Sequence, residues 1–196
     1  MELHQHPIIQ HIQKFVLLTG EEQQLLLSLF QEKQLLRRQY LLQAGDVCKY
    51  DSFVLEGCLR SFYVDDKGDE HTLHFAMEDW WITDLESFLH QTPALVHIEA
   101  LTPVTVLQID KPSLEHLYSA VPAMERFFRI LHQHAYLAQN RRILKNISMN
   151  GEQRYVELLK QYPDLLQRVP QKYIASYLGI TPVFLSQIRA KLGRRH

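Results

Sequence analysis

The chain has 196 residues, of which 46% are hydrophobic and 22% charged, and its formal net charge is −1. This is ordinary globular composition, and it excludes a polycation. Two cysteines are too few for a disulfide framework or for the four ligands of an iron–sulfur cluster. The N-terminus lacks a basic segment followed by a long apolar core, and no apolar run approaches the roughly 18 residues of a membrane span. We therefore expect a cytoplasmic protein without a membrane partner.

Charge is distributed unevenly along the chain. Residues 151–196 carry eight basic and three acidic residues, a balance of +5, whereas residues 1–150 carry thirteen basic and nineteen acidic residues, a balance of −6. An acidic body with a basic end indicates that the end meets a polyanion. The alternative is a basic tail that is only solvated.

Residues 3–110 are predicted to form two helices and a β-rich region. Residues 3–18 have the pattern of an amphipathic helix, and Thr19 with Glu22 forms a capping box for a second helix that ends near Phe30. From residue 34 to 110, short segments rich in β-branched and aromatic residues alternate with turn sequences, which predicts an antiparallel roll, barrel or sandwich. Within it, DDKGDE (65–70) is typical of a hairpin tip, and DLESFLHQTP (84–93) has a helical pattern.

Helical periodicity returns after residue 110, with a short helix near Pro112 and a long one from Pro122 toward Asn150. The long helix carries two apolar lines, and we expect one to pack on the β-rich region and the other on a second copy of the chain. Because two alanines allow helix backbones to approach closely, we assign the first line to a dimer interface: Phe127, Phe128, Leu131, Ala135 and Ala138. The second line contains Ile130, Leu137 and Leu144. The alternative is one wide core stripe on a monomer.

Residues 171–196 are predicted to form two helices joined by a tight turn at Gly179. Thr181 is placed to cap the second helix, and Leu185 and Ile188 give it an apolar back. Its remaining side chains are polar or basic, which suits the major groove of DNA, although a plain helical hairpin has similar spacing. The candidate DNA-contacting residues are Lys172, Thr181, Val183, Ser186, Gln187, Arg189, Lys191 and Arg194.

Taken together, the order of these elements resembles the Crp/Fnr superfamily of bacterial transcription regulators. The resemblance spans residues 12 to 192 and is carried by LQAGD (42–46), VLEGCLRSFYVDDKGDEHTLHFAMEDWW (54–81) and IASYLGITPVFLSQIRAKL (174–192). GITPVFLSQIR is similar to the subgroup common in Bacteroidetes-like bacteria. Many relatives carry Arg and Glu early in the second helix, where this chain has Pro182 and Val183, so we expect a palindromic operator that is not guanine-rich.

The resemblance implies an α+β fold. It consists of a cyclic-nucleotide-binding-like β-roll (jelly roll) with flanking helices (12–110), dimerisation helices (111–149) and a helix-turn-helix domain (150–196). It implies a homodimeric, DNA-binding transcription regulator that is not an enzyme, has no catalytic residue and needs no cofactor or metal. Its implied partners are double-stranded DNA, a second copy of the chain, RNA polymerase and an unknown small-molecule effector. A signal in the roll would change how the long helices pair.

The sequence departs from the family at its phosphate-binding cassette. Cyclic-nucleotide binders have Gly-Glu-Leu at its start, where this chain has Thr83, Asp84 and Leu85, and Arg-Ser or Arg-Thr at its end, where this chain has Ala94 and Leu95. No Arg or Lys lies between Lys67 and Lys111, and a buried cyclic phosphate needs a cationic partner. We expect the effector pocket at these five residues and an effector other than cyclic AMP.

Two other classes of function stay open. His71, His74 and Glu78 resemble a cupin metal site, which suggests a small β-barrel enzyme. Side chains three apart on a regular strand point to opposite faces, so both histidines could bind one metal only across a bulge. A haem role for a histidine, as in the gas sensors of the superfamily, is also open.

The second class of function is a ligand-sensing roll that acts through a protein partner instead of DNA.

Overall fold

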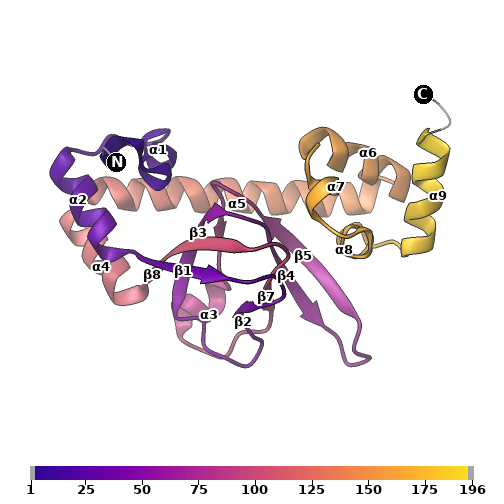
Figure 1. Ribbon diagram of the computed structural model, residues 1–196, viewed down its shortest axis with the longest axis horizontal. Coiled ribbons are helices and arrows are strands. Elements are labelled where there is room, and N and C mark those ends of the chain that lie inside the picture. The colour runs from indigo at the N-terminus through magenta and orange to yellow at the C-terminus, as the bar shows by residue number, and fades with distance from the viewer. Residues whose placement is uncertain (1–2, 194–196) are drawn as a thin grey trace.

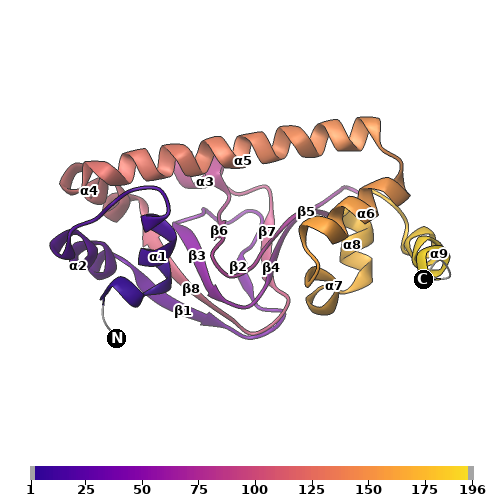
Figure 2. The ribbon, with the colours of Figure 1, turned by 90° about the horizontal axis from the view of Figure 1, so that it is seen from above.

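The computed structural model describes residues 3–193. A 27-residue helix, α5, runs along the long axis of the molecule (Figure 1). A β-roll lies against the middle of α5, helices α1, α2 and α4 gather at one end, and α6 to α9 form the other end (Figures 1 and 2). The elements are η1 (Leu3–Gln5), α1 (Pro7–Gln13), α2 (Gly20–Leu29), β1 (Gln31–Leu35), β2 (Tyr40–Leu42), β3 (Tyr50–Glu56), β4 (Leu59–Val64), β5 (Glu70–Ala76), β6 (Trp81–Ile82), α3 (Leu85–His90), β7 (His97–Ala100), β8 (Val104–Asp110), α4 (Lys111–Ala120), α5 (Pro122–Ser148), α6 (Gly151–Gln161), α7 (Leu165–Arg168), α8 (Gln171–Tyr177) and α9 (Pro182–Gly193).

The roll consists of two four-stranded antiparallel sheets, with strand orders β1-β8-β3-β6 and β2-β7-β4-β5. Fully buried side chains such as Phe53, Leu59 and Ile98 belong to its core. Strands β4 and β5 form the predicted hairpin, and Gly68 at its tip has φ 84°, a conformation that glycine adopts without strain. The sequence-based expectation of an antiparallel β-roll is confirmed.

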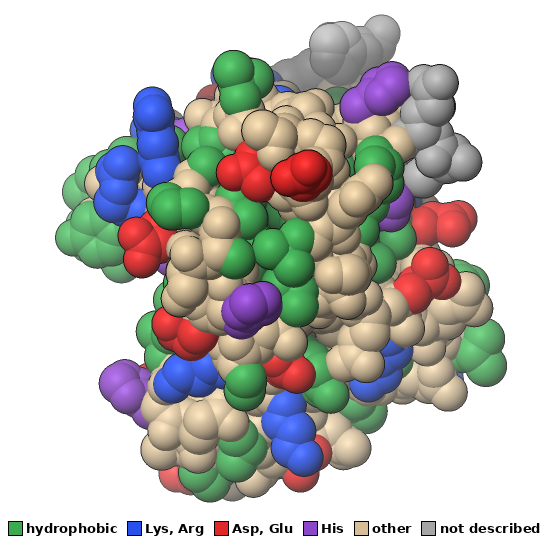
Figure 3. All heavy atoms as spheres, turned by 90° about the vertical axis from the view of Figure 1, so that its left-hand side faces the viewer, with side chains coloured by type: hydrophobic (Ala, Val, Ile, Leu, Met, Phe, Trp, Pro, Cys, Tyr) green, Lys and Arg blue, Asp and Glu red, His purple; other side chains and the backbone are tan. Residues whose placement is uncertain are grey.

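The N-terminal helices differ in part from the prediction. The capping box of Thr19 and Glu22 is present at the start of α2. The expected helix over residues 3–18 is instead a short 3-10 turn followed by α1, which begins at Pro7 and ends at Gln13. Proline has no amide hydrogen and suits the first turn of a helix, so it starts a new helix here. Figure 3 views this end of the molecule, where acidic, basic and hydrophobic side chains are interspersed.

The two apolar lines of α5 differ in burial. Phe127 and Phe128 are 0% and 2% exposed and belong to the core of the chain itself, and Leu131 packs against that core. Ala135 and Ala138 follow Phe128 and Leu131 by seven residues, about two helical turns, and so lie on the same side of the helix. The assignment of this line to a dimer interface is therefore wrong for Phe127 and Phe128, because their side chains are already buried.

The opposite face of α5 carries the exposed apolar side chains. Within residues 3–193, no helix is both long and apolar enough to span a bilayer. This face is confined to the C-terminal half of α5, where no other part of residues 3–193 buries these side chains. The exposed apolar residues are Tyr136, Leu137, Ile143, Leu144 and Ile147; below, they are called the outer stripe.

Candidate nucleic-acid interface and effector region

Helix α9 has one buried and one exposed face. Leu185 and Ile188 are buried in the core of the C-terminal helices, as the sequence predicts. The Thr181 hydroxyl accepts a hydrogen bond from the Phe184 amide at 3.2 Å and so caps the first turn of the helix. Gly179, at φ 63°, makes the turn between α8 and α9. The opposite face of α9 is exposed at Val183, Ser186, Gln187, Arg189 and Lys191.

Some of the predicted contact residues already have partners. The Lys191 ammonium lies 2.6 Å from the Glu152 carboxylate on α6, and the Ser186 hydroxyl donates to the Pro182 carbonyl. Lys172 is exposed on α8, with its ammonium 4.6 Å from the ring centroid of Tyr173. Arg194 lies outside the described residues. A polyanion on α9 would therefore have to displace Lys191 from Glu152, whereas the Gln187 side chain is exposed.

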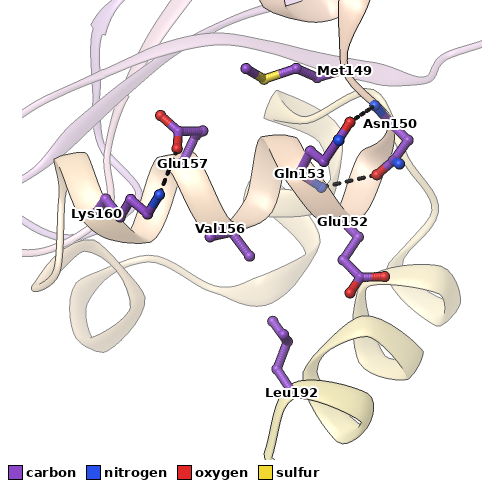
Figure 4. A pocket seen from close by; sticks show the side chains of 8 residues that line it. All are labelled: Met149, Asn150, Glu152, Gln153, Val156, Glu157, Lys160 and Leu192. Carbon is purple, nitrogen blue, oxygen red and sulfur yellow. Dashed lines mark hydrogen bonds and ion pairs between the residues drawn. The ribbon is translucent and has the colours of Figure 1, made fainter. Parts of the chain in front are cut away.

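A groove of about 550 Å³ lies between α6 and α9 (Figure 4). In Figure 4 the Leu192 side chain points from α9 toward Val156 on α6. Lys160 pairs with Glu157 at 3.0 Å along the same helix. The charges at this groove are thus paired with one another, and the exposed face of α9 is the better candidate surface for a polyanion.

The sequence analysis did not identify Gly151, the residue that allows α9 to pack closely on α6. Gly151 is buried at the start of α6, and a Cβ atom there would lie 2.9 Å from the Phe184 ring and 3.0 Å from Ile180. The absence of a side chain thus lets Phe184 pack closely on α6. The only sequence signal was the pair Asn150-Gly151, which also fits a simple helix stop.

The five residues predicted to form an effector pocket come together around the start of α3. Asp84 caps α3 by accepting the Ser87 amide at 3.1 Å, and its second oxygen accepts the Leu95 amide at 3.3 Å. Thr83 donates to the Tyr50 carbonyl. Leu85 and Leu95 are exposed, and Ala94 is buried. Asp84 therefore links the two ends of the cassette, which is a structural role.

The cation nearest in sequence to the end of the cassette is engaged elsewhere. The Lys111 ammonium donates to the Leu89 carbonyl at 2.6 Å, at the end of α3. In β4, Arg60 is 1% exposed and ion-paired to Glu99 and Glu70. Arg60 is therefore already paired with two carboxylates, and Lys111 is hydrogen-bonded at the end of α3.

The histidines that resemble a cupin site do not converge on a metal position. Leu73 is an extra residue in β5, because Ser61 pairs with His74 and Phe62 pairs with Thr72, so the bulge that such a site requires is present. Even so, His71 pairs with Asp65 at 2.8 Å, outside the strand. Burial, and then the nearby Arg142 charge, lower the pKa of His74 to about 4.

Glu78, the third member of that set, is bound by Arg168 through two contacts of 2.6 and 2.7 Å. This hydrogen bonding lowers the pKa of Glu78 to about 2. Among residues 3–193, no group of three His, Cys, Asp or Glu is arranged to hold a metal ion.

Comparison with known proteins agrees with the β-roll. Residues 32–120 match the cyclic nucleotide-binding domain. No curated protein matches the sequence. The matched segment runs from β1 through α4 and so includes residues 83–95, where the effector pocket is predicted.

Solved structures resemble nearly the whole chain. The c-di-GMP-responsive global regulator CLP of Xanthomonas campestris superposes with a TM-score of 0.74 at 14% identity, covering 90% of this chain and 93% of that chain. FixK2 of Bradyrhizobium japonicum gives 0.72 at 16%, covering 85% of each chain. The catabolite activator protein of Thermus thermophilus gives 0.55 at 18%, covering 100% of this chain and 88% of that chain. At such identities the likeness establishes the fold, and the Bacteroidetes-like subgroup stays a prediction.

Proposed function

We propose that this protein is a sequence-specific DNA-binding transcription regulator of the Crp/Fnr type, in which α8 and α9 form a helix-turn-helix and α9 is the recognition helix. The observation that carries the proposal is the two-faced character of α9. Its apolar back is buried by Leu185 and Ile188, and its front, with Gln187 and Arg189, is exposed at the end of the molecule (Figure 1). A helix with these two faces can enter a major groove while its domain stays folded.

The structural neighbours support the same function. The chain superposes on CLP, which is described as a global regulator, over 90% of its length. Coverage of this extent exceeds the length of the roll alone. The catabolite activator protein adds a second neighbour covering the whole chain. We propose that the protein is not an enzyme, because its fold is similar to that of these regulators and because His71, His74 and Glu78 do not converge on one site.

We further propose a homodimer formed through the outer stripe of α5. Leu137 and Leu144 are seven residues apart, and Tyr136, Ile143 and Ile147 follow spacings of seven and four, which is the periodicity of a helix–helix seam. Asn140 lies within this seam, between Tyr136 and Ile143. A polar residue at such a position fixes the register of paired helices. Two-fold symmetry would then present two α9 helices to a palindromic operator.

The effector is proposed to be a molecule other than cyclic AMP. Asp84 is used as a cap, Ala94 and Leu95 take the place of the Arg-Ser or Arg-Thr pair, and Lys111 is bound to a carbonyl. A signal in the roll would act by shifting the population of two arrangements of the α5 and α9 pairs.

The test is a fluorescence-anisotropy titration of the protein with duplex DNA at several salt concentrations. We expect tight binding to a duplex selected by the protein from a random pool, weaker binding to a scrambled duplex, and a steep loss of affinity with salt. A protein that binds neither duplex at low salt would contradict the proposal and favour action through a protein partner.

A further inference from the structure

A buried arginine lies on the face of the β2-β7-β4-β5 sheet that is turned toward α8. Arg60, in β4, is 1% exposed. Its Nε and Nη2 atoms lie 2.8 and 2.7 Å from one carboxylate oxygen of Glu99, which is opposite it in β7. Its Nη1 atom lies 2.7 Å from the Glu70 carboxylate in β5. Three adjacent strands thus hold this guanidinium in a fixed plane.

The guanidinium is also enclosed between two aromatic rings. Its Cζ atom lies 3.8 Å from the ring centroid of Phe62 and 3.7 Å from that of Tyr173. Phe62 belongs to the same strand, whereas Tyr173 belongs to α8. Guanidinium groups stack well on aromatic faces because they are planar and weakly hydrated. Tyr173 is therefore the contribution of the C-terminal helices to the shielding of Arg60.

Helix α8 also closes the open edge of the sheet. Strand β5 is the last strand in the order β2-β7-β4-β5, so one of its edges lacks a neighbouring strand. The Ser176 hydroxyl accepts a hydrogen bond from the Thr72 amide and donates one to the Glu70 carbonyl, both at 2.8 Å. One side chain of α8 thus satisfies two backbone groups of this edge.

Helix α5 joins the same contact through Arg142. Its guanidinium donates to the carbonyls of Thr72 and Leu73 in β5 and to the Tyr177 carbonyl at the end of α8. It also lies 4.2 Å from the ring centroid of Tyr177. The long helix, the edge strand and α8 therefore meet at one polar joint. We call the set Arg60, Arg142, Tyr173 and Ser176 the α8 joint.

From this geometry we infer that Arg60 is a positioning residue, which holds α8 through Tyr173 and thereby sets the direction in which α9 projects from the dimer. The inference rests on the proposed function and extends it. The joint does not cover the front of α9, where Gln187 is exposed, so it orients the recognition helix without blocking it. The two recognition helices of a dimer must lie one turn of DNA apart, about 34 Å, and a fixed direction raises the effective concentration of the second helix at its half-site.

The test changes the α8 side of the joint. Removing Arg60 itself would leave Glu99 buried without its partner and destabilise the roll. Instead, Tyr173→Leu and Ser176→Ala are combined in one variant. Tyr63→Leu is the matched control. It is the same change from Tyr to Leu, made in the strand that carries Arg60 but at a side chain that is 41% exposed.

Hydrogen exchange of the DNA-free protein provides the first readout. The amide followed is that of Leu178, which donates to the Ile174 carbonyl at the end of α8 and to neither replaced side chain. We expect it to exchange at least about tenfold faster in the double variant than in the wild type and the control. Unchanged exchange would overturn the inference, because the joint would then not hold α8 on the sheet. This readout does not depend on DNA binding.

Anisotropy with a selected palindrome and with its single half-site provides the second readout. In the double variant we expect the Kd for the palindrome to rise about tenfold and that for the half-site to change less than about twofold. Equal weakening on both duplexes, or no weakening on the palindrome, would overturn the positioning role. Failure of the wild type to bind either duplex would instead contradict the proposed function itself, and the exchange result would still show whether the joint holds α8.

Discussion

Gln187 and Lys191 lie about one turn apart on the exposed front of α9, but we expect them to contribute differently to DNA binding. A glutamine amide pairs with adenine, whereas an ammonium neutralises phosphate. Gln187→Ala should cost about 1–3 kcal/mol on the selected duplex and little on scrambled DNA. Lys191→Ala should weaken binding to both duplexes alike and flatten the salt dependence of the affinity by about one unit. The change is smaller to the extent that Glu152 already neutralises Lys191 in the free protein. Anisotropy titrations measure both, and equal losses for Gln187→Ala on the two duplexes would contradict base contact by this residue.

A second residue-scale prediction concerns Asp51, which is buried in β3 and accepts a hydrogen bond from the Ser52 amide at 2.8 Å. Burial raises the pKa of Asp51 to about 7. Between the ordinary pKa, near 4, and 7 the folded state binds more protons than the unfolded state, so this group's contribution to stability falls as pH rises through that window. His74 acts in the opposite sense, because its lowered pKa makes stability fall as pH drops from about 6.5 toward 4.

Asp51→Asn keeps the acceptor for Ser52 but cannot ionise. The gain in unfolding free energy of this variant over the wild type should be at least about 1 kcal/mol larger at pH 8 than at pH 5. Urea unfolding of both proteins at each pH measures the difference and cancels the His74 contribution. A gain that is the same at both pH values would contradict the raised pKa of Asp51 in the folded state.

At the scale of single elements, α5 offers a direct comparison of its two faces. Leu144 belongs to the outer stripe and is 64% exposed. Ala138 is also exposed, but by helical spacing it lies on the side of Leu131. Leu144→Glu should place charges in the helix–helix seam and give monomers at micromolar concentration, and Ala138→Glu should remain dimeric. Light scattering with sedimentation measures the mass. Dissociation by Ala138→Glu alone would restore the original assignment of the dimer interface, and a monomeric wild type would refute the dimer.

The cassette around α3 gives the second element-scale prediction. Because Asp84 is a cap and Ala94 and Leu95 replace the Arg-Ser or Arg-Thr pair, cyclic AMP at physiological concentration should neither raise the melting temperature nor alter DNA binding. Isothermal calorimetry provides the direct measurement. Binding in the micromolar range would mean that the roll finds another partner for the phosphate.

Elements with strong local signals could be predicted from the sequence. The Thr19 capping box, the hairpin tip at Gly68 and the Thr181 cap depend on neighbours within a few residues, and all are present. The two lines of α5 could not be assigned, because both have helical spacing and only tertiary packing decides which one faces the roll. The α8 joint could not be predicted from the sequence either, because Arg60 and Tyr173 are far apart in the chain and meet only in the folded structure.

At the scale of the whole molecule, side-chain contacts join the roll and α5 to the C-terminal helices, in addition to the backbone connection. Arg60 and Arg142 connect the sheet to α8, and Arg168 connects α7 to Glu78 through two contacts. Cys58, Phe75 and Leu101 of the roll region share a core with the C-terminal helices. A change in the roll can therefore reach α9 through α8 as well as through α5.

The central claim is that a two-fold dimer places two α9 helices in successive major grooves. Hydroxyl-radical footprinting of the protein on its selected duplex tests this claim most directly. The account predicts two protected patches, symmetric about the centre of the palindrome and about one helical turn (~34 Å) apart. A single protected half-site, or protection without two-fold symmetry, would contradict it.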